Sequence, residues 1–236
     1  SKAKIPGKSL LELDDDEDLQ ELAGKSFEDL QRAMGDRKTA ETGKRKHAER
    51  IQALLERGLF SVKLRDELYL QLIKQLTENP TCDSRLHGWE VMCCYAVCFP
   101  PSIHMDKWAL KFVEGVAEQA ATLEGGEKMK KMAEYALKKL RRLCQIGPKG
   151  HVPTVPEVER AIIAPFHISP FGETLDEIMR HPELVDESGR YPRILIFLSE
   201  AVMKLGGCST EGIFRVPGDI EGVTALKLRI ENGDYS

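Results

Sequence analysis

The chain has 236 residues, of which 42% are hydrophobic and 31% are charged, and its formal net charge is −4. No apolar run reaches the roughly 18 residues that a membrane-spanning helix needs, so the sequence predicts no membrane span. The first residues, Ser1 to Pro6, contain no apolar stretch of the signal-peptide type.

The six cysteines do not form a metal-binding pattern. They lie at positions 82, 93, 94, 98, 144 and 208, with no Cys-x-x-Cys pair and no His-x3-5-His partner. The sequence therefore predicts neither a zinc site nor any other metal or cofactor. Cys93, Cys94 and Cys98 lie in an apolar run, where thiols behave as small hydrophobic side chains, so we expect reduced thiols in a cytoplasmic protein.

The N-terminal segment is polar and acidic before the helices begin. Residues 1–9 are predicted as disordered or linker. The acidic run at 14–18 is expected to supply negative charge to the first turn of a helix that begins near Leu19. Ser26 is expected to cap a short helix that ends at Gly35. Residues 36–46 are charged and are predicted as a surface loop.

Four helices are predicted between residues 47 and 123, and helix-breaking residues follow each of them. Their ranges are 47–57, 64–78, 88–99 and 107–123, and their breakers are Gly58, Asn79-Pro80, Pro100-Pro101 and Gly125-Gly126. The second helix is apolar except for a narrow strip near Glu67, Gln71 and Lys74, so we expect it at the centre of a domain.

Residues 127–146 are expected to form a strongly amphipathic helix. At 100° per residue its apolar side chains fall in one arc, and lysines and arginines cover the opposite arc. Residues 127–150 carry eight basic and two acidic side chains, a local balance of +6. The candidate partner-binding residues are Lys138, Lys139, Arg141 and Arg142.

This basic arc has two interpretations. It can dock on a strongly acidic surface such as that of a microtubule, or it can simply be the solvated face of the helix. Nucleic acid is not predicted as a partner, because no aromatic side chains interleave with the basic ones.

The remainder of the chain is expected to be helical after a boundary rich in proline and glycine. A short helix at 157–163 precedes a linker at 164–170, and a second helical region begins near Leu175. Pro192 is expected at the first position of a helix over 193–205, which Gly206-Gly207 ends. A last helix is predicted at 220–230. With no alternating strand pattern of useful length before residue 150, the fold class is all-α.

Several polar and aromatic residues are predicted to be structural. His87 and His104 have no nucleophile or metal partner at a mechanistic spacing. Asp66 and Glu67 are expected to bond nearby backbone or Arg65 rather than to act as acid and base. Trp89 and Trp108 are expected to anchor the core.

A set of motifs in the first two-thirds of the chain has a specific order and spacing. It consists of the run Leu64 to Thr77, Asn79-Pro80, Gly88-Trp89-Glu90, Phe99-Pro100-Pro101-Ser102 and Pro153-x-x-Pro156-Glu157-Val158. On these motifs residues 10–163 resemble the MyTH4 domain of unconventional myosin tails. The resemblance implies a helical bundle without catalytic activity that binds cytoskeletal partners, including microtubules. The family usually precedes a FERM domain, and no part of this chain resembles one.

A second set of motifs follows the linker. Phe171-Gly172-x-x-Leu175, Pro192-x3-Ile196 and the run Thr210 to Gly218, which contains Glu211-Gly212-Ile213-Phe214-Arg215, resemble the start of a RhoGAP domain. A MyTH4 domain followed directly by RhoGAP is similar to the Vilse (CrossGAP) type of Rho GTPase-activating proteins. That resemblance implies Rac and Cdc42 as partners and an upstream region with WW domains.

Arg215 matches the arginine finger of the RhoGAP motif. GTP hydrolysis spreads negative charge over the transferring phosphoryl group, and an arginine supplied in trans stabilises that charge, which is worth roughly 10³–10⁵ in rate. Lysine lacks the planar fork of donors and is a poor substitute. The alternative for a lone arginine in a glycine-flanked loop is an ordinary surface residue. Ile213 and Phe214 are expected to anchor the loop so that only the arginine projects.

Two hypotheses of function follow. In the first, the protein is not itself an enzyme but activates Rho-family GTPases, with residues 171–236 as an incomplete RhoGAP domain that does not accelerate hydrolysis alone. In the second, it is a MyTH4 scaffold that binds microtubules or another cytoskeletal or signalling partner through the basic helix. Either predicts a cytoplasmic protein that can associate with the cytoskeleton.

Overall fold

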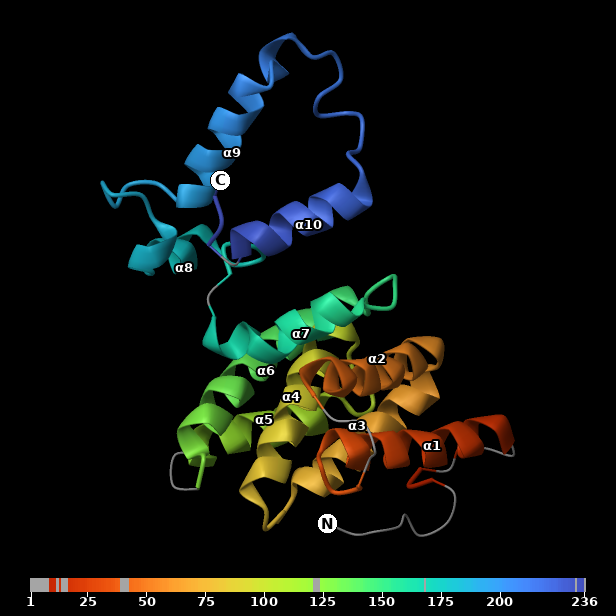
Figure 1. Ribbon diagram of the computed structural model, residues 1–236. Helices are drawn as coiled ribbons and strands as arrows, with labels where there is room; N and C mark the ends of the chain where they lie inside the picture. Colours follow the sequence, from red (N-terminus) through yellow and green to blue (C-terminus); the bar gives the residue numbers. More distant parts are fainter. Residues whose placement is uncertain are drawn as a thin grey trace. The chain divides into compact units, whose positions relative to one another are not determined.

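The computed structural model describes residues 9–11, 13, 17–38, 43–120, 124–167, 169–231 and 233–235. The chain divides into two compact units, Ser1–Phe166 and His167–Ser236, and Figure 1 colours the chain from red to blue along the sequence. The division falls inside residues 164–170, the range predicted as a linker. The predicted linker at 1–9, apart from Ser9, and residues 14–16 of the acidic run lie outside the described residues.

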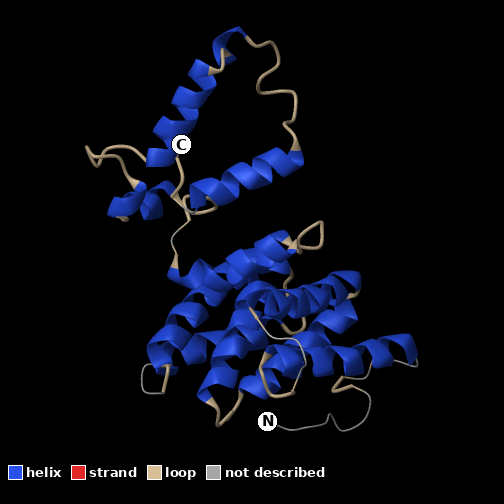
Figure 2. Ribbon diagram, in the orientation of Figure 1, coloured by secondary structure: helices blue, strands red, loops and turns tan. Residues whose placement is uncertain are grey.

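The described part of the first unit consists of helices joined by short loops (Figures 1 and 2). These helices are α1 (Glu17–Ala33), α2 (Lys44–Phe60), α3 (Val62–Leu76), α4 (Cys82–Cys98), α5 (Asp106–Gln119), α6 (Gly126–Ile146) and α7 (Val155–Ile163). A short 3-10 turn, Ala164–Phe166, follows α7.

The second unit contains shorter helices and longer connections. They are α8 (Leu175–Met179), α9 (Arg193–Lys204) and α10 (Ile220–Glu231), with 3-10 turns at Pro182–Leu184 and Gly207–Ser209. An isolated antiparallel bridge joins Val185 and Pro192. No strand occurs in the described residues, and the prediction of an all-α chain is confirmed.

The core of the first unit is built around α3 and α4. Along α4 nearly every residue from Gly88 to Cys98 is buried, and α4 packs against α2, α3, α6 and α7. Tyr69 of α3 lies edge-on to Tyr95 and Phe99, and its hydroxyl donates to the carbonyl of Phe99 at 2.9 Å. Helices that are apolar nearly all round are stable only in such a central position.

The prediction that Gly58 ends a helix is wrong, because α2 continues to Phe60. A Cβ atom at Gly58 would lie 2.3 Å from the ring of Phe99. The glycine therefore permits close contact between α2 and the aromatic cluster of α3 and α4, and it does not break the helix.

The prediction that Ser26 caps a new helix is also wrong. α1 runs without interruption through Ser26, whose hydroxyl donates to the carbonyl of Leu22, one turn earlier, at 2.6 Å. A serine hydroxyl can satisfy itself in this way inside a helix. The predicted end of this helix is confirmed, since Gly35 has a left-handed φ of 79°.

Candidate functional site

The basic helix predicted at 127–146 is α6, and its apolar and basic side chains lie on opposite faces, as the sequence predicted. Its apolar arc is buried against α4 and α5, with Cys144 half-buried, and consists of Met129, Met132, Ala133, Ala136, Leu140 and Leu143. Burial of this arc turns the opposite arc to solvent. Lys138, Arg141 and Arg142 are exposed there, and Lys139 is half-exposed.

Neighbouring groups orient some of these cations. The guanidinium of Arg141 donates to Glu114 of α5 at 2.5 Å, and the ammonium of Lys139 lies 5.4 Å from the centre of the Tyr135 ring. Nearer the start of α6, Lys130 and Lys131 lie within 4 Å of Glu134 and Glu127. The excess of positive charge is therefore greatest in the last two turns of α6, where the helix contains no acidic residue after Glu134.

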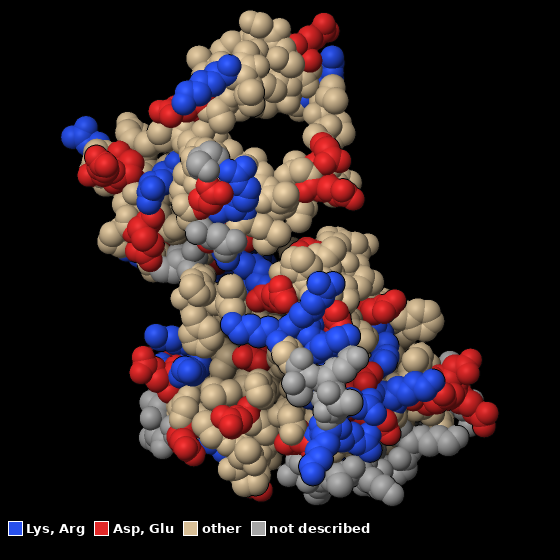
Figure 3. Space-filling model, in the orientation of Figure 1, with Lys and Arg blue, Asp and Glu red and all other residues tan. Residues whose placement is uncertain are grey.

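Basic side chains occur on more than one face of the first unit. In Figure 3 its lysines and arginines lie among aspartates and glutamates. On α1 and α2, for example, Arg32 and Arg57 both contact Asp29, and Arg45 contacts Glu49. Such pairs at a surface contribute little stability and lower the local positive potential.

Arg215 lies in a tight exposed turn of the second unit, between α9 and α10. The left-handed Gly206 (φ 76°) ends α9 as predicted, and Gly212 also has a φ of 76°. The carbonyl of Gly212 accepts from the N–H groups of Arg215 and Val216 at 2.8 and 2.9 Å. The Arg215 side chain is 79% exposed, and its guanidinium lies 3.9 Å from Glu211.

The prediction that Phe214 anchors this loop is wrong. The phenyl ring is 97% exposed. Ile213 instead points toward the turn that follows α9, where a Cβ atom on Gly207 would lie 2.8 Å from its Cδ1. The described part of the second unit places no helix over Phe214, so the arginine is not the only side chain that projects.

Glu67 and Asp66 accept hydrogen bonds from backbone N–H groups that are distant in sequence. Glu67 is fully buried, and its two carboxylate oxygens accept from the N–H groups of Leu10 and Leu11 at 2.8 and 2.7 Å. Asp66 accepts from the N–H of Ser102 at 2.7 Å. The prediction of backbone bonding is right in kind, but the bonded residues lie 56, 57 and 36 positions away rather than nearby.

Trp89 is buried as predicted and stacks on Phe112, with ring centres 6.2 Å apart. Trp108 is not a core anchor, because it is 45% exposed. The buried residues of α5 are Ala109, Val113 and Ala117, spaced by four. Trp108 precedes Ala109 by one residue, which places it about 100° away from that buried stripe.

The histidines and cysteines of the described residues belong to no cluster that could hold a metal ion. His47 contacts Glu90 at 2.8 Å, and the rings of His47 and His87 are 5.3 Å apart. Burial raises the pKa of the Cys98 thiol to about 12 and also raises the pKa values of Cys93 and Cys94 well above the ordinary range. These thiols are therefore protonated, unreactive core groups at neutral pH.

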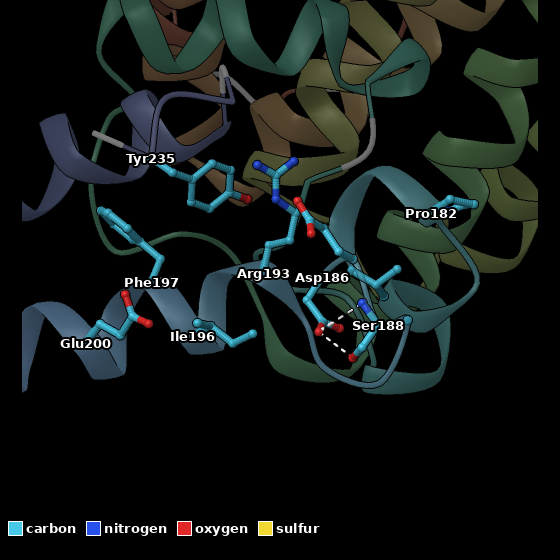
Figure 4. Close-up of a pocket in the computed structure, with 11 residues that line it drawn as sticks. Pro182, Asp186, Ser188, Arg193, Ile196, Phe197, Glu200 and Tyr235 are labelled. Carbon is cyan, nitrogen blue, oxygen red and sulfur yellow. Dashed lines mark hydrogen bonds between the residues drawn. The ribbon is translucent and has the colours of Figure 1, made fainter.

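The second unit also contains an open recess beside a turn that the sequence analysis did not single out (Figure 4). Asp186 closes this turn by accepting from the N–H groups of Ser188, Arg190 and Tyr191 and from the hydroxyl of Ser188. These hydrogen bonds, the Ser188 hydroxyl first, lower the pKa of Asp186 to about 2. The run Asp-Glu-Ser-Gly at 186–189 is a typical signal of such a turn.

The aromatic wall of the recess is formed by Phe197 and Tyr235, whose rings meet edge-on at 5.4 Å, and the Arg193 guanidinium lies 4.9 Å from the Tyr235 ring.

No helix in the described part of the chain is long and apolar enough to cross a bilayer.

A family model described as the MyTH4 domain matches residues 51–160. A myosin-I heavy chain of Dictyostelium discoideum is 31% identical over 109 residues, which are 46% of this chain and 4% of that protein. The kinesin-like protein KIN-14E of Arabidopsis thaliana is 32% identical over 109 residues, or 46% of this chain and 8% of that protein. The chain thus spans less than a tenth of the length of these relatives.

Solved structures give the same match. The MyTH4-FERM MF1 domain of Dictyostelium discoideum myosin VII (a mutant form) superimposes with a TM-score of 0.58 at 27% identity, over 65% of this chain and 30% of that chain. The C-terminal MyTH4-FERM domain of human myosin 7b, solved in complex with the harmonin-a PDZ3 domain, gives a TM-score of 0.52 at 27% identity. It covers 62% of this chain and 28% of that chain.

Proposed function

We propose that this chain, whose residues 51–160 form a MyTH4 domain, is a non-catalytic docking module that binds an acidic cytoskeletal surface, that of a microtubule, through the last turns of α6. The observation that carries the proposal is the exposure of Lys138, Arg141 and Arg142 opposite a fully packed apolar arc. The proposed location is the cytoplasm, in association with the cytoskeleton.

Electrostatics supports this choice of partner. Cations gathered on one rigid helix raise the rate of encounter with an acidic surface and orient the approach, whereas scattered ion pairs do not. The relatives named above are myosin and kinesin-like proteins, and human myosin 7b uses its MyTH4-FERM region in a complex with another protein domain. We infer that this chain likewise works by binding a partner.

Co-sedimentation with taxol-stabilised microtubules tests the proposal. Charge reversal of Lys138, Lys139, Arg141 and Arg142 to Glu is expected to weaken binding at least about tenfold and to abolish its salt dependence. The matched control reverses four other basic residues, Lys25, Lys44, Arg45 and Lys204, which changes the net charge equally. If both variants lose binding to the same extent, or neither does, the α6 surface is not the site.

A second candidate function is favoured by the Arg215 turn. We propose that, within a longer protein, Arg215 enters the active site of a Rho-family GTPase such as Rac or Cdc42 and stabilises the charge that develops during GTP hydrolysis. The support is the exposure of the Arg215 side chain and the tight turn at Gly212 that presents it. In this role the protein is a GTPase activator and not itself an enzyme.

Single-turnover GTP hydrolysis by Rac and Cdc42 tests the second candidate. The 236-residue chain alone is expected not to stimulate hydrolysis. A longer natural chain that includes it is expected to stimulate hydrolysis, and Arg215→Ala is expected to reduce that stimulation by roughly 10³-fold or more. Arg193→Ala, a substitution elsewhere in the second unit, is the control. Full stimulation by the Arg215→Ala protein would exclude the finger role.

A further inference from the structure

One end of the first unit gathers the termini of five helices. The guanidinium of Arg65, in the first turn of α3, donates to the carbonyl of Gly58 near the end of α2. Tyr69 bonds Phe99 after the end of α4, and the N–H of Lys149, just beyond α6, donates to the carbonyl of Cys98. The ends of α2, α4 and α6 therefore meet the start of α3.

The start of α5 belongs to the same end. The loop before α5 is tied to α3 by the bond from Ser102 to Asp66. α5 and α6 pack against each other, and Arg141 contacts Glu114. Asp106, the first residue of α5, lies close enough to Cys144 to raise the pKa of its thiol, an effect second to burial. Trp108, in the first turn of α5, therefore lies at the same end of the unit as the last turn of α6.

Large apolar side chains are exposed at this end. Each belongs to one of the termini or loops just described, and the exposed fractions are Phe60 77%, Val62 51%, Ile103 81%, Trp108 45% and Ile146 66%. We call these five residues the apolar end. Single exposed apolar residues are ordinary, but several gathered on one part of a surface mark an interaction site.

Basic side chains lie around the apolar end. Lys107 and Lys111 are exposed on the same helix as Trp108, and Arg141 and Arg142 lie within the last two turns of α6 before Ile146. Three carboxylates also lie nearby: Asp66 accepts from the N–H of Ser102, Asp106 from the N–H of Lys107, and Glu114 pairs with Arg141. A partner that combines apolar side chains with negative charge would complement both the apolar end and the exposed Lys107 and Lys111.

We propose that the apolar end, together with the last turns of α6, binds an acidic amphipathic helix of a partner protein. A helix with apolar residues at positions i, i+3, i+4 and i+7 presents one stripe to the five apolar side chains, and its acidic flanks meet Lys107 and Lys111. The inference rests on the proposed docking function and narrows the partner. A flexible acidic tail would engage the cations alone.

Trp108 provides the test without any label. It is half-exposed at the proposed site, whereas Trp89 is buried. Two synthetic peptides of about 18 residues and equal net charge are the probes. One is an amphipathic helix of leucines and glutamates, and the other mixes glutamate with glycine and serine. The full chain is expected to bind the amphipathic peptide at least about tenfold more tightly, with a blue shift and less acrylamide quenching of Trp108.

Substitutions separate this inference from the docking function on which it rests. The double variant Ile103→Ser/Ile146→Ser changes two exposed positions and is expected to weaken binding of the amphipathic peptide only. Leu175→Ser, in the second unit, is expected to weaken binding of neither peptide. The charge reversal of the four basic residues of α6 is expected to weaken the binding of both peptides and of microtubules. Trp108→Phe identifies the source of the fluorescence change.

Two results would overturn the inference alone: equal affinity for the two peptides, or unchanged quenching of Trp108, while microtubules still bind. Failure of microtubule binding by the unmodified chain would instead overturn the docking function. If the double Ile→Ser variant kept its affinity for the amphipathic peptide, the peptide would bind elsewhere and the proposed site would be wrong.

Discussion

At the scale of single residues, Glu67 shows how a buried carboxylate is stabilised without a cation. Its oxygens receive the N–H groups of Leu10 and Leu11 and the side-chain amide of Gln71, which also donates to the carbonyl of Ala23 in α1. Leu13, just beyond these contacts, is buried in the core. One polar cluster on α3 thus fixes both the N-terminal segment and α1.

We expect Glu67→Gln to destabilise the first unit by about 1–3 kcal/mol, because the NH2 group that replaces one carboxylate oxygen would then face an N–H group that needs an acceptor. Urea unfolding measures the change, and faster amide exchange at Leu10 and Leu11 assigns it. Glu118→Gln, an exposed change on α5, is the control and should stay within about 0.5 kcal/mol. Equal stability of both variants would contradict the role given to Glu67.

The stability of the turn that Asp186 closes is expected to depend on pH. Its pKa is lowered to about 2 by the hydrogen bonds that it accepts, so the stabilisation is present above the ordinary pKa of about 4 and is lost as the pH falls toward 2. The side-chain carbon shift of Asp186 in NMR spectra should titrate near pH 2, and the Tyr191 amide should follow it. In Asp186→Asn the Tyr191 amide should no longer respond over this range; a midpoint near 4 in the original chain would refute the assignment.

At the scale of helices, Gly58 shows that the extent of α2 depends on its packing against Phe99 rather than on the low helix propensity of glycine. We expect Gly58→Ala to lower the free energy of unfolding by about 1–3 kcal/mol, because its methyl group would overlap the Phe99 ring. Gly115, in α5, has no atom within 4 Å of an added Cβ, so Gly115→Ala should be neutral or stabilise by up to about 1 kcal/mol. The two variants are compared by chemical denaturation, and an equal effect would show that packing at Gly58 is unimportant.

The same comparison shows what the sequence can predict about helices. Amphipathic periodicity located α6 and its buried arc within one residue, because an isolated apolar stripe has a single way to be buried. The end of α2 was missed because the sequence does not show which aromatic ring faces Gly58. Ser26 was missed for a similar reason, since a serine that caps a helix and one that bonds the preceding turn look alike in sequence.

The candidate site was predicted only in part for a related reason. Lysines and arginines at regular spacing indicate the solvent face of α6, and the structure exposes or half-exposes them. The apolar end was not predicted because its five side chains come from five different elements: α2, α3, the loop before α5, α5 and α6. Trp108 and Phe214 were both expected to anchor structure, as large aromatic residues usually do. Their exposure depends on which neighbours cover them, which periodicity does not give.

At the scale of the whole molecule, the two units differ in how well their helices are buried. α4 has ten buried residues, whereas α9 has none, and Leu205, Phe214 and Ile220 in the second unit are more than 80% exposed. Local stability follows buried apolar contact. The second unit is therefore expected to be the less stable of the two.

We expect two unfolding transitions, with amides of α9 exchanging well before those of α4. Leu72→Ala, at a fully buried position of α3, should lower the stability of the first unit by about 2–5 kcal/mol and leave exchange in α9 unchanged. Hydrogen exchange followed by mass spectrometry makes both measurements. A single cooperative transition with equal protection of the two helices would be inconsistent with this picture.

The contacts of Glu67 also bear on how the domain is delimited. The region matched by the family model begins at residue 51, inside α2. A polypeptide cut at that point would keep Glu67 and Gln71 but lose Leu10, Leu11 and the whole of α1. The Glu67 carboxylate would keep only the Gln71 donor, and the apolar side chains that α1 covers would be exposed to water. We therefore expect the folding unit to be longer than the matched stretch and to include Leu10, Leu11 and α1, so a chain divided for expression at residue 51 should be less stable.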